Sequence, residues 1–538
     1  MNDMQIGGCW SAQPGPAVQA HDFVVGGFGL SHGAGVAVHE DEHCLLAIVG
    51  QIFDVPVALA MHDQSRLDTA YGLFSYVRYD KVSGAITIGT DRFGFSPIYH
   101  AVEDGRVIFG TSLGHVKSQL KQRSPDYDAW EELMVLGEVI GDKSTVKEIK
   151  RLLHGTRIEI RDGRVSFPVY WVPELPEPSS EAAYIEGNNR LLGEALALTA
   201  PNPLRKVVLL SGGEDSRRLA LSAVKEGLPV DFYTQESVYK GSYKIGVDRD
   251  VKLAAKVAQV LGRPHFIEPM PDDEKYLQNW HLRNDCLGFE CIAHEWLLPL
   301  AQRIEPGALI YDGIVGDITT NGHYFKAYPS AVTNYRDLDA MAEMICGEHQ
   351  SPWLGELRRH TTRPLKERVR ELLASYPDSP HRLTFYFILN HTRRKIACVS
   401  QLFGLSGHYT CYPFLYYPFF LHSLSIDPAR LITHFYQREC MEALGPEVLS
   451  VPTTREKISD DWVILRGDKE QEQEDYLLTQ LQVSERAFEM FPSLRLRYHA
   501  LRALSGISMK PLRAYGWQIP SIAKYSYFLA WLDKDAAA

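Results

Sequence analysis

The residues best suited to chemistry form one short segment, Ser211-Gly-Gly-Glu-Asp-Ser216. It follows the wholly apolar run Val207–Leu210 and precedes a helical pattern from Ser216 to Glu226, so we expect it to join a buried strand to a helix. In that position Gly212 and Gly213 allow close backbone approach, while backbone N–H groups and the helix dipole attract an anion. The segment therefore predicts a phosphate-binding loop.

Three side chains of this loop refine the prediction. Ser211 and Ser216 add hydroxyl donors, and Asp215 repels phosphate unless it holds a magnesium ion that bridges the phosphates. A plain turn with Ser216 as the helix N-cap would explain Ser-Gly-Gly alone, but the whole hexapeptide behind an apolar strand favours phosphate. The Gly-Lys-Ser/Thr ending of a Walker loop is absent. We expect ATP and Mg²⁺ as cofactors, bound through Ser211, Gly212, Gly213, Asp215 and Ser216.

The pattern around the loop predicts a doubly wound α/β unit. Further strands are expected at Val230–Thr234 and His265–Glu268, with an amphipathic helix at Asp250–Leu261 between them. Strand, helix, strand, helix and strand at this spacing are typical of a parallel sheet covered on both faces. Beyond residue 270 the sequence predicts a mainly helical chain.

The first 170 residues have a different sequence pattern, which predicts a β-rich domain. Short apolar runs between turn signals predict strands at Cys44–Val49, Leu73–Tyr79, Ala85–Ile88 and Arg106–Phe109. The longest apolar stretch, Leu45–Met61, is interrupted by polar residues and Pro56, which predicts two buried strands and no membrane span.

A proline-rich segment, 173–180, predicts the linker between the two regions. A helix is expected to begin at Ser180 or Glu181 and to run to about Leu198. We therefore divide the chain into residues 1–172, a linker at 173–182, and residues 183–538.

Composition narrows the classes of function. The chain has 538 residues, enough for two to three domains, and 45% hydrophobic and 23% charged residues, as in globular proteins. Its net charge of -11 argues against a dedicated nucleic-acid binder. No secretory signal, CxxC pair or disulfide framework is evident among its eight cysteines, so we expect a cytoplasmic protein without nucleic-acid or membrane partners.

The loop also resembles the SGGxDS pyrophosphate loop of the N-type ATP pyrophosphatases, and other segments extend this resemblance to asparagine synthetases. Four segments resemble the N-terminal glutaminase-like domain of that family: Gly50-Gln-Ile-Phe53, Asp91-Arg-Phe-Gly-Phe-Ser-Pro-Ile-Tyr99, Lys150-Arg-Leu152 with Gly155, and Tyr170-Trp171. Four resemble its synthetase domain: Asp250–Gly262, Asp312-Gly-Ile-Val-Gly-Asp317, Tyr412-Pro-Phe414 and Arg455-Glu-Lys457.

The resemblance implies a fold and three site roles. The fold is a β-rich sandwich of the N-terminal-nucleophile (Ntn) hydrolase type, followed by an α/β PP-loop synthetase domain, of the adenine nucleotide alpha hydrolase type, with a helical C-terminal part. Asp317 joins Asp215 in binding magnesium and pyrophosphate, and Lys457 contacts the phosphates and stabilises the transition state. Without the resemblance, Asp317 would be interpreted as an ordinary loop carboxylate and Lys457 as a solvated surface residue. Arg438 lies near another basic position of the family, but an ordinary surface role fits it equally well.

The sequence departs from that family at the glutaminase nucleophile. Such glutaminases use an N-terminal cysteine with a free α-amine, whereas residue 2 here is Asn, too large for normal removal of the initiator Met. We expect Cys9, the nearby thiol, to be a small buried residue, and the first domain to be a degenerate glutaminase fold. Related β-lactam synthetases and lasso-peptide cyclases lack the cysteine and use an amine of the activated substrate.

A second departure concerns the general base. Ile314 stands where the family often has a polar residue, and it cannot accept a proton. Glu290, Glu295, His294 and His323 are unranked candidates for this role. The segment His294–Leu300 resembles a helix that lines the acyl site of β-lactam formers, but it also fits a plain core helix.

Three functions follow from these residues. The leading one is an ATP- and Mg²⁺-dependent amide synthetase that adenylates a small-molecule or peptide carboxylate and forms an internal amide of the macrolactam or β-lactam type. In that case a precursor peptide or a partner biosynthetic enzyme is expected. The second is an asparagine-synthetase-like amidotransferase that uses free ammonia or a separate glutaminase. The third is a non-catalytic nucleotide-binding scaffold, favoured by Ile314 and disfavoured by intact Asp215, Asp317 and Lys457.

Overall fold

Strand β5 (Cys44–Ile52) shows how the apolar N-terminal sequence becomes a layered structure. Successive side chains of a strand point to opposite faces. The odd-numbered residues of Leu45–Val49 belong to the core between two sheets, and the even-numbered residues of Cys44–Ile48 pack against helices α2 (Val57–Ala60) and α3 (Gln64–Thr69). A strand covered on both faces needs no polar side chain, which accounts for the uninterrupted apolar run.

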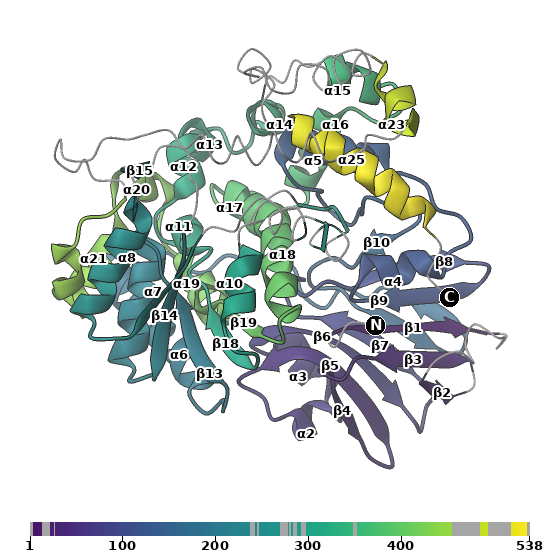
Figure 1. Cartoon of the computed structure of the whole chain (residues 1–538), viewed down its shortest axis with the longest axis horizontal. Coiled ribbons are helices and arrows are strands. Elements are labelled where there is room, and N and C mark those ends of the chain that lie inside the picture. Colours follow the sequence, from purple (N-terminus) through teal and green to yellow (C-terminus); the bar gives the residue numbers. More distant parts are fainter. Residues whose placement is uncertain are drawn as a thin grey trace.

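The computed structural model describes residues 4–12, 22–25, 27–236, 243–244, 247–269, 278, 281–282, 284, 288–291, 297–347, 352–454, 485–492 and 518–534. Figure 1 shows the two antiparallel sheets and the parallel sheet that make up its frame.

Two six-stranded antiparallel sheets pack face to face in the N-terminal part. In order, the first contains β10 (Lys150–Arg151), β8 (Tyr99–Glu103), β9 (Arg106–Gly110), β1 (Ile6–Ser11), β3 (Phe28–His32) and β2 (Phe23–Val25). The second contains β12 (Arg164–Ser166), β11 (Ile158–Arg161), β7 (Ile86–Thr90), β6 (Gly72–Asp80), β5 and β4 (Ala37–Glu40). Helices α4 (Leu113–Ser118) and α5 (Tyr127–Leu136) join the core on the outer face of the first sheet. The layers therefore run helix, sheet, sheet, helix.

The four N-terminal strands expected from apolar runs are present as β5, β6, β7 and β9. The expectation of two strands within Leu45–Met61 was wrong, because the second half forms helix α2 after Pro56. Proline fixes φ near the helical value and is tolerated next to the first helical turn, so it starts the helix there instead of interrupting a second strand.

A five-stranded parallel sheet forms the frame of the second part, in the order β17 (His265–Glu268), β14 (Val230–Gln235), β13 (Arg205–Leu209), β18 (Ala308–Tyr311) and β19 (Tyr409–Cys411). Helices α6 (Glu181–Thr199), α7 (Glu214–Lys225) and α8 (Arg249–Val260) share the core on one face. Helices α10 (Leu297–Arg303) and α18 (Arg393–Gly404) pack on the other. The doubly wound arrangement confirms the expected α/β unit. Strands β18 and β19, in the region expected to be helical, were missed.

The remaining described helices all follow β18 in the sequence. They are α11 (Gly316–Thr319), α12 (His323–Ala327), α13 (Ser330–Thr333), α14 (Leu338–Cys346), α15 (Pro352–Leu357), α16 (Leu365–Ala374), α17 (Arg382–Tyr386), the π-helix η1 (Phe387–Thr392), η2 (Pro413–Leu415), α19 (Tyr417–Ser423), α20 (Pro428–Thr433), α21 (Tyr436–Leu444), η3 (Pro446–Ser450), α23 (Glu485–Met490) and α25 (Gln518–Asp533). A small hairpin joins β15 (Tyr243–Lys244) to β16 (Val247–Asp248).

The C-terminal helix α25 returns to the N-terminal part of the chain and lies along α5 (Figure 1). Tyr525 and Phe528 pack on the buried ring of Trp130, with ring centroids 4.8 and 5.0 Å away. Lys117 of α4 donates to the Trp531 carbonyl at 2.6 Å. Tyr525 and Trp531 are thus buried aromatic residues of the main core.

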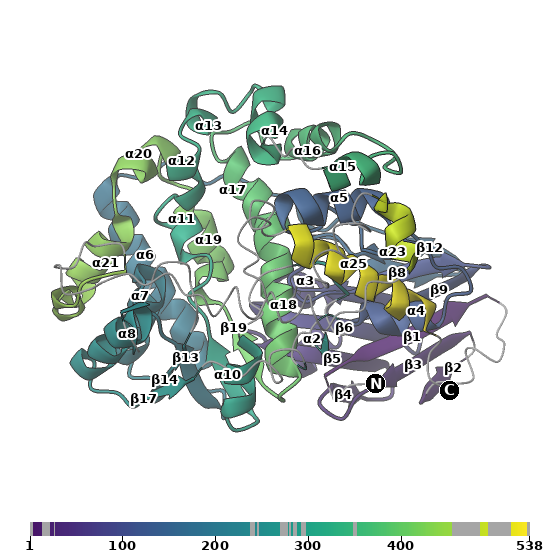
Figure 2. The same ribbon diagram turned by 45° about the horizontal axis from the view of Figure 1, so that its top comes forward.

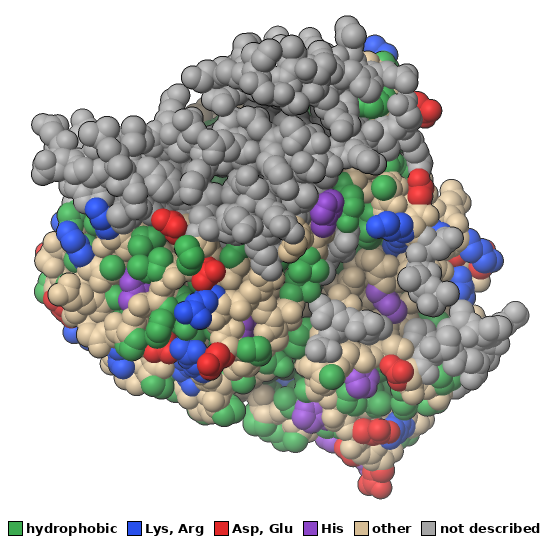
Figure 3. Space-filling model, viewed as in Figure 1, with side chains coloured by type: hydrophobic (Ala, Val, Ile, Leu, Met, Phe, Trp, Pro, Cys, Tyr) green, Lys and Arg blue, Asp and Glu red, His purple; other side chains and the backbone are tan. Residues whose placement is uncertain are grey.

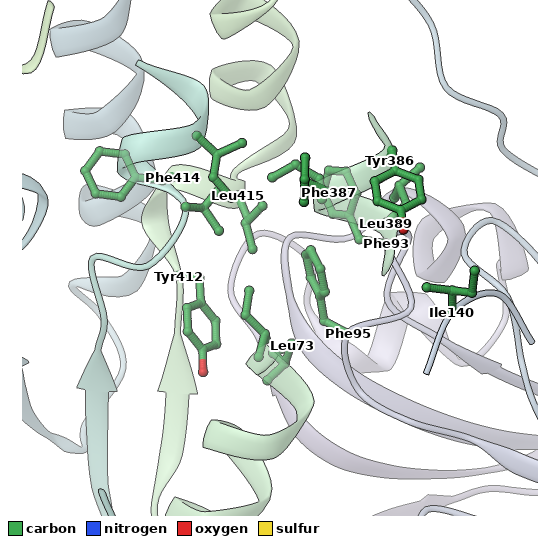
Figure 4. Close-up of a cluster of buried hydrophobic side chains, with 14 of the residues drawn as sticks. Leu73, Phe93, Phe95, Ile140, Tyr386, Phe387, Leu389, Tyr412, Phe414 and Leu415 are labelled. Carbon is green, nitrogen blue, oxygen red and sulfur yellow. The ribbon is translucent and has the colours of Figure 1, made fainter. Parts of the chain in front are cut away.

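Helix α18 stands between the parallel sheet and the antiparallel sheets in both Figure 1 and Figure 2. Beside it, an apolar cluster fills the contact between the two parts (Figure 4), with Leu73, Phe93 and Phe95 from one side and Tyr412 and Phe414 from the other. This continuous core fixes the parallel sheet relative to the N-terminal layers. In the face drawn in Figure 3, the coloured residues show acidic and basic side chains interspersed. Among the described residues, no helix has the length and apolarity needed to cross a membrane.

Candidate nucleotide site

The expected phosphate loop lies at the C-terminal end of β13, directly before α7. The Ser216 hydroxyl accepts from the Ser211 backbone N–H at 3.0 Å and lies 2.7 Å from the Ser211 hydroxyl. The Gly212 N–H donates to the Asp250 carboxylate at 2.8 Å. These bonds hold the loop in a defined shape from within, with Gly213 as the helix N-cap.

A buried arginine ties the loop to a segment far away in the sequence. Arg217 is fully buried and donates to the backbone carbonyls of Gly212 and Pro452, at 3.3 and 2.9 Å. Thr454 then donates its backbone N–H to the Gly212 carbonyl at 3.3 Å. The expected phosphate-contacting residue Lys457 lies outside the described residues, so its role stays a prediction.

The second acidic loop packs directly against the first. A methyl group on Gly313 would lie 2.9 Å from the Ser216 backbone nitrogen, and one on Gly316 would lie 2.9 Å from Asp215 Oδ1. Both distances are shorter than real Cβ contacts, and at Gly313 the neighbours are backbone atoms, so only glycine permits the approach there. The fold therefore brings the loop of Asp317 against the carboxylate of Asp215.

Backbone strain marks the turn between these two glycines. Val315 is fully buried with φ of 87°, in the left-handed region that β-branched residues rarely adopt. Such strain costs of order 1–3 kcal/mol, persists only where the surroundings impose it, and clusters at functional sites. Here the turn presents Asp317 in the first turn of α11.

The acidic pair suits a cation that is shared with phosphates. Asp317 is partly exposed, and its carboxylate lies 3.7 Å from His323 Nδ1. No group of three or more His, Cys, Asp or Glu side chains is arranged as a metal cage in the described part of the chain. Magnesium is commonly held by one or two carboxylates together with substrate phosphates, so the donor set of Asp215 and Asp317 fits Mg²⁺ bound with a nucleotide.

Gln437 is a site residue that sequence reasoning missed. Its side-chain N–H donates to Asp215 Oδ1 at 2.6 Å, and its carbonyl accepts from the buried Arg218 at 2.6 Å. Arg218 thereby selects the amide orientation that presents a donor to Asp215. The neighbouring Arg438, considered from the resemblance, is exposed on α21.

Asp312 begins the second acidic loop and is partly buried. Its carboxylate accepts from the Ile314 N–H at 3.0 Å. Burial raises the pKa of Asp312 to about 6, because the charged form loses solvation. Ile314 packs against the main core. Its side chain is aliphatic and therefore cannot accept a proton.

The structure distinguishes among the four candidates for the general base. Glu290 is buried and accepts from Tyr99 at 2.9 Å; it also pairs with Arg394 and, at 3.5 Å, with Arg151. This ion cluster joins the N-terminal sheets to α18, which is a structural role, so Glu290 is not a suitable base. His294 and Glu295 lie outside the described residues. His323 remains beside Asp317.

A histidine–glutamate pair, also missed from the sequence, lies near the same loop. His391 Nδ1 is 2.8 Å from a carboxylate oxygen of Glu138, whose side chain is almost fully buried. The ring of Tyr324 lies 5.8 Å from that of His391 and 5.2 Å from that of His323. His391 belongs to π-helix η1, and π-bulges are frequent at functional sites. No local sequence signal links residues 138 and 391.

In the described N-terminal residues, Cys9 has the position of a structural side chain. Cys9 is fully buried in the middle of β1, paired with Gly29 and Ile108, and burial raises the pKa of its thiol, as expected of a structural residue. Before β1, Met4 and Gln5 line a cavity of about 80 Å³ against α18 and β19. The residues lining this cavity include no cysteine.

Comparisons with known proteins agree with part of this description. The sequence model of a glutamine amidotransferase domain matches residues 55–171. Among solved structures, the chain is similar to glutamine phosphoribosylpyrophosphate amidotransferase from B. subtilis complexed with ADP and GMP, at 8% identity over 49% of this chain and 85% of that chain, with a TM-score of 0.21.

It is also similar to the NMN synthetase of Francisella tularensis, at 16% identity over 40% of this chain and 96% of that chain, with a TM-score of 0.19. These TM-scores are too low to support an argument about fold or function. No curated protein sequence matches the chain. What the comparisons establish is a glutamine-amidotransferase-like segment in the N-terminal part, spanning residues 55–171.

Proposed function

We propose that this chain is an ATP- and Mg²⁺-dependent ligase that activates a carboxylate as an acyl-adenylate and converts it into an amide. The observation that carries the proposal is the contact between the Ser211–Ser216 loop and the Gly313–Asp317 loop, which brings Asp317 towards Asp215. Two carboxylates beside a glycine-rich loop at a strand end suit the binding of a metal–triphosphate, which a purely structural turn would not require.

The proposed reaction has two steps. The substrate carboxylate attacks the α-phosphate of ATP, the bond to the β-phosphate breaks, and pyrophosphate leaves. An amine then attacks the acyl carbon, AMP leaves with the bonding electrons, and the amine loses a proton. Mg²⁺, held by Asp215 and Asp317, would neutralise charge on the leaving pyrophosphate. The chain's own contributions are the backbone N–H groups of the loop, the Gln437 amide on Asp215 and, as predicted from the sequence, Lys457.

We assign the proton acceptor of the second step to His391. Glu138, buried behind it, lies 2.8 Å from Nδ1 and orients the ring, which is the arrangement that a general base needs. The rings of Tyr324 and His323 connect His391 to Asp317 in a series of contacts, which places the pair in the neighbourhood of the second acidic loop. In this proposal, His391 takes the role of the polar residue that Ile314 replaces in this chain.

The amine is proposed to come from the substrate itself, giving a macrolactam or β-lactam from a peptide or small-molecule carboxylate. The buried Cys9 and the cysteine-free cavity beside Met4 support an N-terminal part that does not hydrolyse glutamine. Intramolecular attack gains from high effective molarity. The match of residues 55–171 to a glutamine amidotransferase domain favours, as a second candidate, an amidotransferase supplied with ammonia from elsewhere.

Two measurements test these proposals. Exchange of labelled pyrophosphate into ATP is expected with at least one carboxylate from a peptide and amino-acid panel, and its absence with every carboxylate would overturn the adenylation step. The product is then weighed with ammonium or glutamine present: a loss of one water supports internal cyclisation, whereas a gain of nitrogen supports the second candidate.

The role of His391 has its own test. His391→Gln is expected to keep pyrophosphate exchange and to lose amide product, with part of the product restored by added imidazole. His360→Gln, at an exposed histidine on the ring of Tyr127, is the control and should change neither reaction. Equal loss of both reactions in His391→Gln, without imidazole rescue, would instead indicate a structural role.

A further inference from the structure

A second cavity, of about 160 Å³, lies between the N-terminal sheets and the segment that follows β19. Its walls come from the ends of β5, β6 and β7 on one side and from residues 415–418 on the other. A cavity of roughly 150 Å³ in another protein is large enough to hold benzene. The space is therefore sufficient for a compact organic molecule and is separate from the nucleotide loop, whose residues do not line it.

The unusual residue of this cavity is Arg92. Its side chain is about nine-tenths buried, yet Nε and Nη1 have no hydrogen-bond partner. Within the described residues no carboxylate lies in ion-pair distance of it. Its guanidinium instead lies 3.7 Å from the ring centroid of Tyr417, and that ring is held by Trp171, which donates to the Tyr417 hydroxyl at 3.2 Å.

Three acidic side chains lie nearby: Asp54 and Asp91 line the cavity, and Glu174 accepts from the Tyr417 hydroxyl. Asp54 and Glu174 favour the charged form of Arg92 through space, but in the described part of the chain neither forms an ion pair with it. Asp91 accepts from the backbone N–H groups of Phe93, Phe95 and Ser96, which closes the turn after β7. Asp54 accepts from the Tyr71 N–H at 2.8 Å. A buried cation without a directly paired counter-ion is costly. The cation–π contact with Tyr417 offsets only part of that cost, so the cavity presents a positive charge that a ligand anion would complete.

The walls indicate what that anion is attached to. Tyr71 and Tyr416 meet at 4.9 Å, edge to face, and Phe93 forms part of the same lining. Arginine donates through a planar fork that matches a carboxylate, and aromatic walls favour a flat or compact apolar body. We propose that this cavity is a binding site for a compact organic carboxylate about the size of benzoate, with Arg92 as its anion-binding residue.

This site goes beyond the proposed ligase activity and does not depend on it. The cavity is formed by both parts of the chain, so a bound carboxylate would contact the N-terminal sheets and the Leu415–Pro418 segment together. It would thereby stabilise their association. The N-terminal part then has a role other than glutamine hydrolysis.

Ligand-observed NMR on the full-length protein tests the proposal with two matched probes. Benzoate and benzamide have the same size and shape, but only benzoate carries the anion. Benzoate is expected to bind at least about 10-fold more tightly than benzamide, since a hydrogen bond to a charged group contributes roughly 1.5–3 kcal/mol. Benzoate should also raise the melting temperature.

Two variants assign the binding to Arg92. Arg92→Leu is expected to abolish the preference for benzoate while keeping or raising the melting temperature, because it removes an uncompensated buried charge. Arg164→Leu, at an exposed position of β12, is the control and should leave binding unchanged. Equal binding of the two probes to the wild type, or unchanged benzoate binding in Arg92→Leu, would overturn the proposal. If Arg92→Leu does not fold, Arg92→Gln, which removes the charge but keeps a polar side chain, decides by the same comparison.

Discussion

The contact between the two loops can be tested by adding a single methyl group at Gly313. In Gly313→Ala the new Cβ would meet the Ser216 nitrogen at 2.9 Å, and the Asp215 carbonyl carbon and Ser216 Cα at 3.0 Å. All three are backbone atoms, so no side chain can turn away. Ordinary contact begins at 3.4 Å, and the loops must therefore separate by about 0.5 Å, the difference between 3.4 and 2.9.

The expected consequences follow from that displacement. Overpacking of this kind costs about 1–3 kcal/mol of stability. A misplacement of about 1 Å near a reaction centre costs roughly 100-fold in rate, so half that displacement predicts about a 10-fold slower pyrophosphate exchange. Both quantities can be measured on one preparation, by exchange of labelled pyrophosphate into ATP and by thermal unfolding.

A matched glycine supplies the control. Gly355 lies within α15 with nothing inside 4 Å of an added Cβ. Gly355→Ala should therefore leave exchange unchanged and stabilise the helix by roughly 0.5–1 kcal/mol. If Gly313→Ala matches the wild type in both exchange and melting temperature, the loops are not in the close contact on which the site depends.

Two further predictions concern stability. The pKa of Asp312 is about 6 in the folded protein, against an ordinary value of 3.8. The stability that protonated Asp312 contributes is therefore fully present below about pH 4 and is lost as the pH rises through 6. Above that pH, ionisation of Asp312 lowers the free energy of unfolding by up to about 3 kcal/mol. Urea unfolding from pH 4 to 8 should show Asp312→Asn gaining stability over the wild type up to about pH 6 and then levelling, and a gap independent of pH would contradict this. Glu290→Gln leaves Arg151 and Arg394 without their counter-charge and should lose about 3–5 kcal/mol in the same assay, whereas exposed Glu305→Gln should lose almost nothing. A small loss at Glu290 would mean that the ion cluster does not join the two parts.

The elements predicted best from the sequence were those with a local signal, such as a run of consecutive apolar residues or a helix-capping side chain. The run Val207–Leu210 around the end of β13 is wholly apolar because helices cover both faces of the sheet, and Ser180 is the N-cap of α6 as expected, accepting from the Ala183 N–H at 3.3 Å. Strands β18 and β19 have only four and three residues and lie in a region whose other segments read as helices. The equally short β17 was found because it follows a predicted strand and helix in regular alternation. The return of α25 to α5 has no local signal at all.

The site shows the same division. Asp215 and Asp317 were predicted from motifs, and the fold brings their loops into contact through Gly313 and Gly316. Gln437 could not be predicted, because it meets Asp215 only after α21 has packed against α7. The pairing of His391 with Glu138 likewise depends on tertiary structure, since 253 residues separate the two. Motifs identify loops, whereas partners from distant helices appear only in three dimensions.

The most direct test of the central claim is carboxylate-dependent exchange of labelled pyrophosphate into ATP, compared between the wild type and Asp317→Asn. Asn is nearly isosteric, so the fold should be retained, as thermal unfolding can verify. The proposed function predicts exchange in the wild type with its carboxylate substrate and its loss in Asp317→Asn. Exchange that is undiminished in Asp317→Asn, or absent from the wild type with every carboxylate tried, would contradict it.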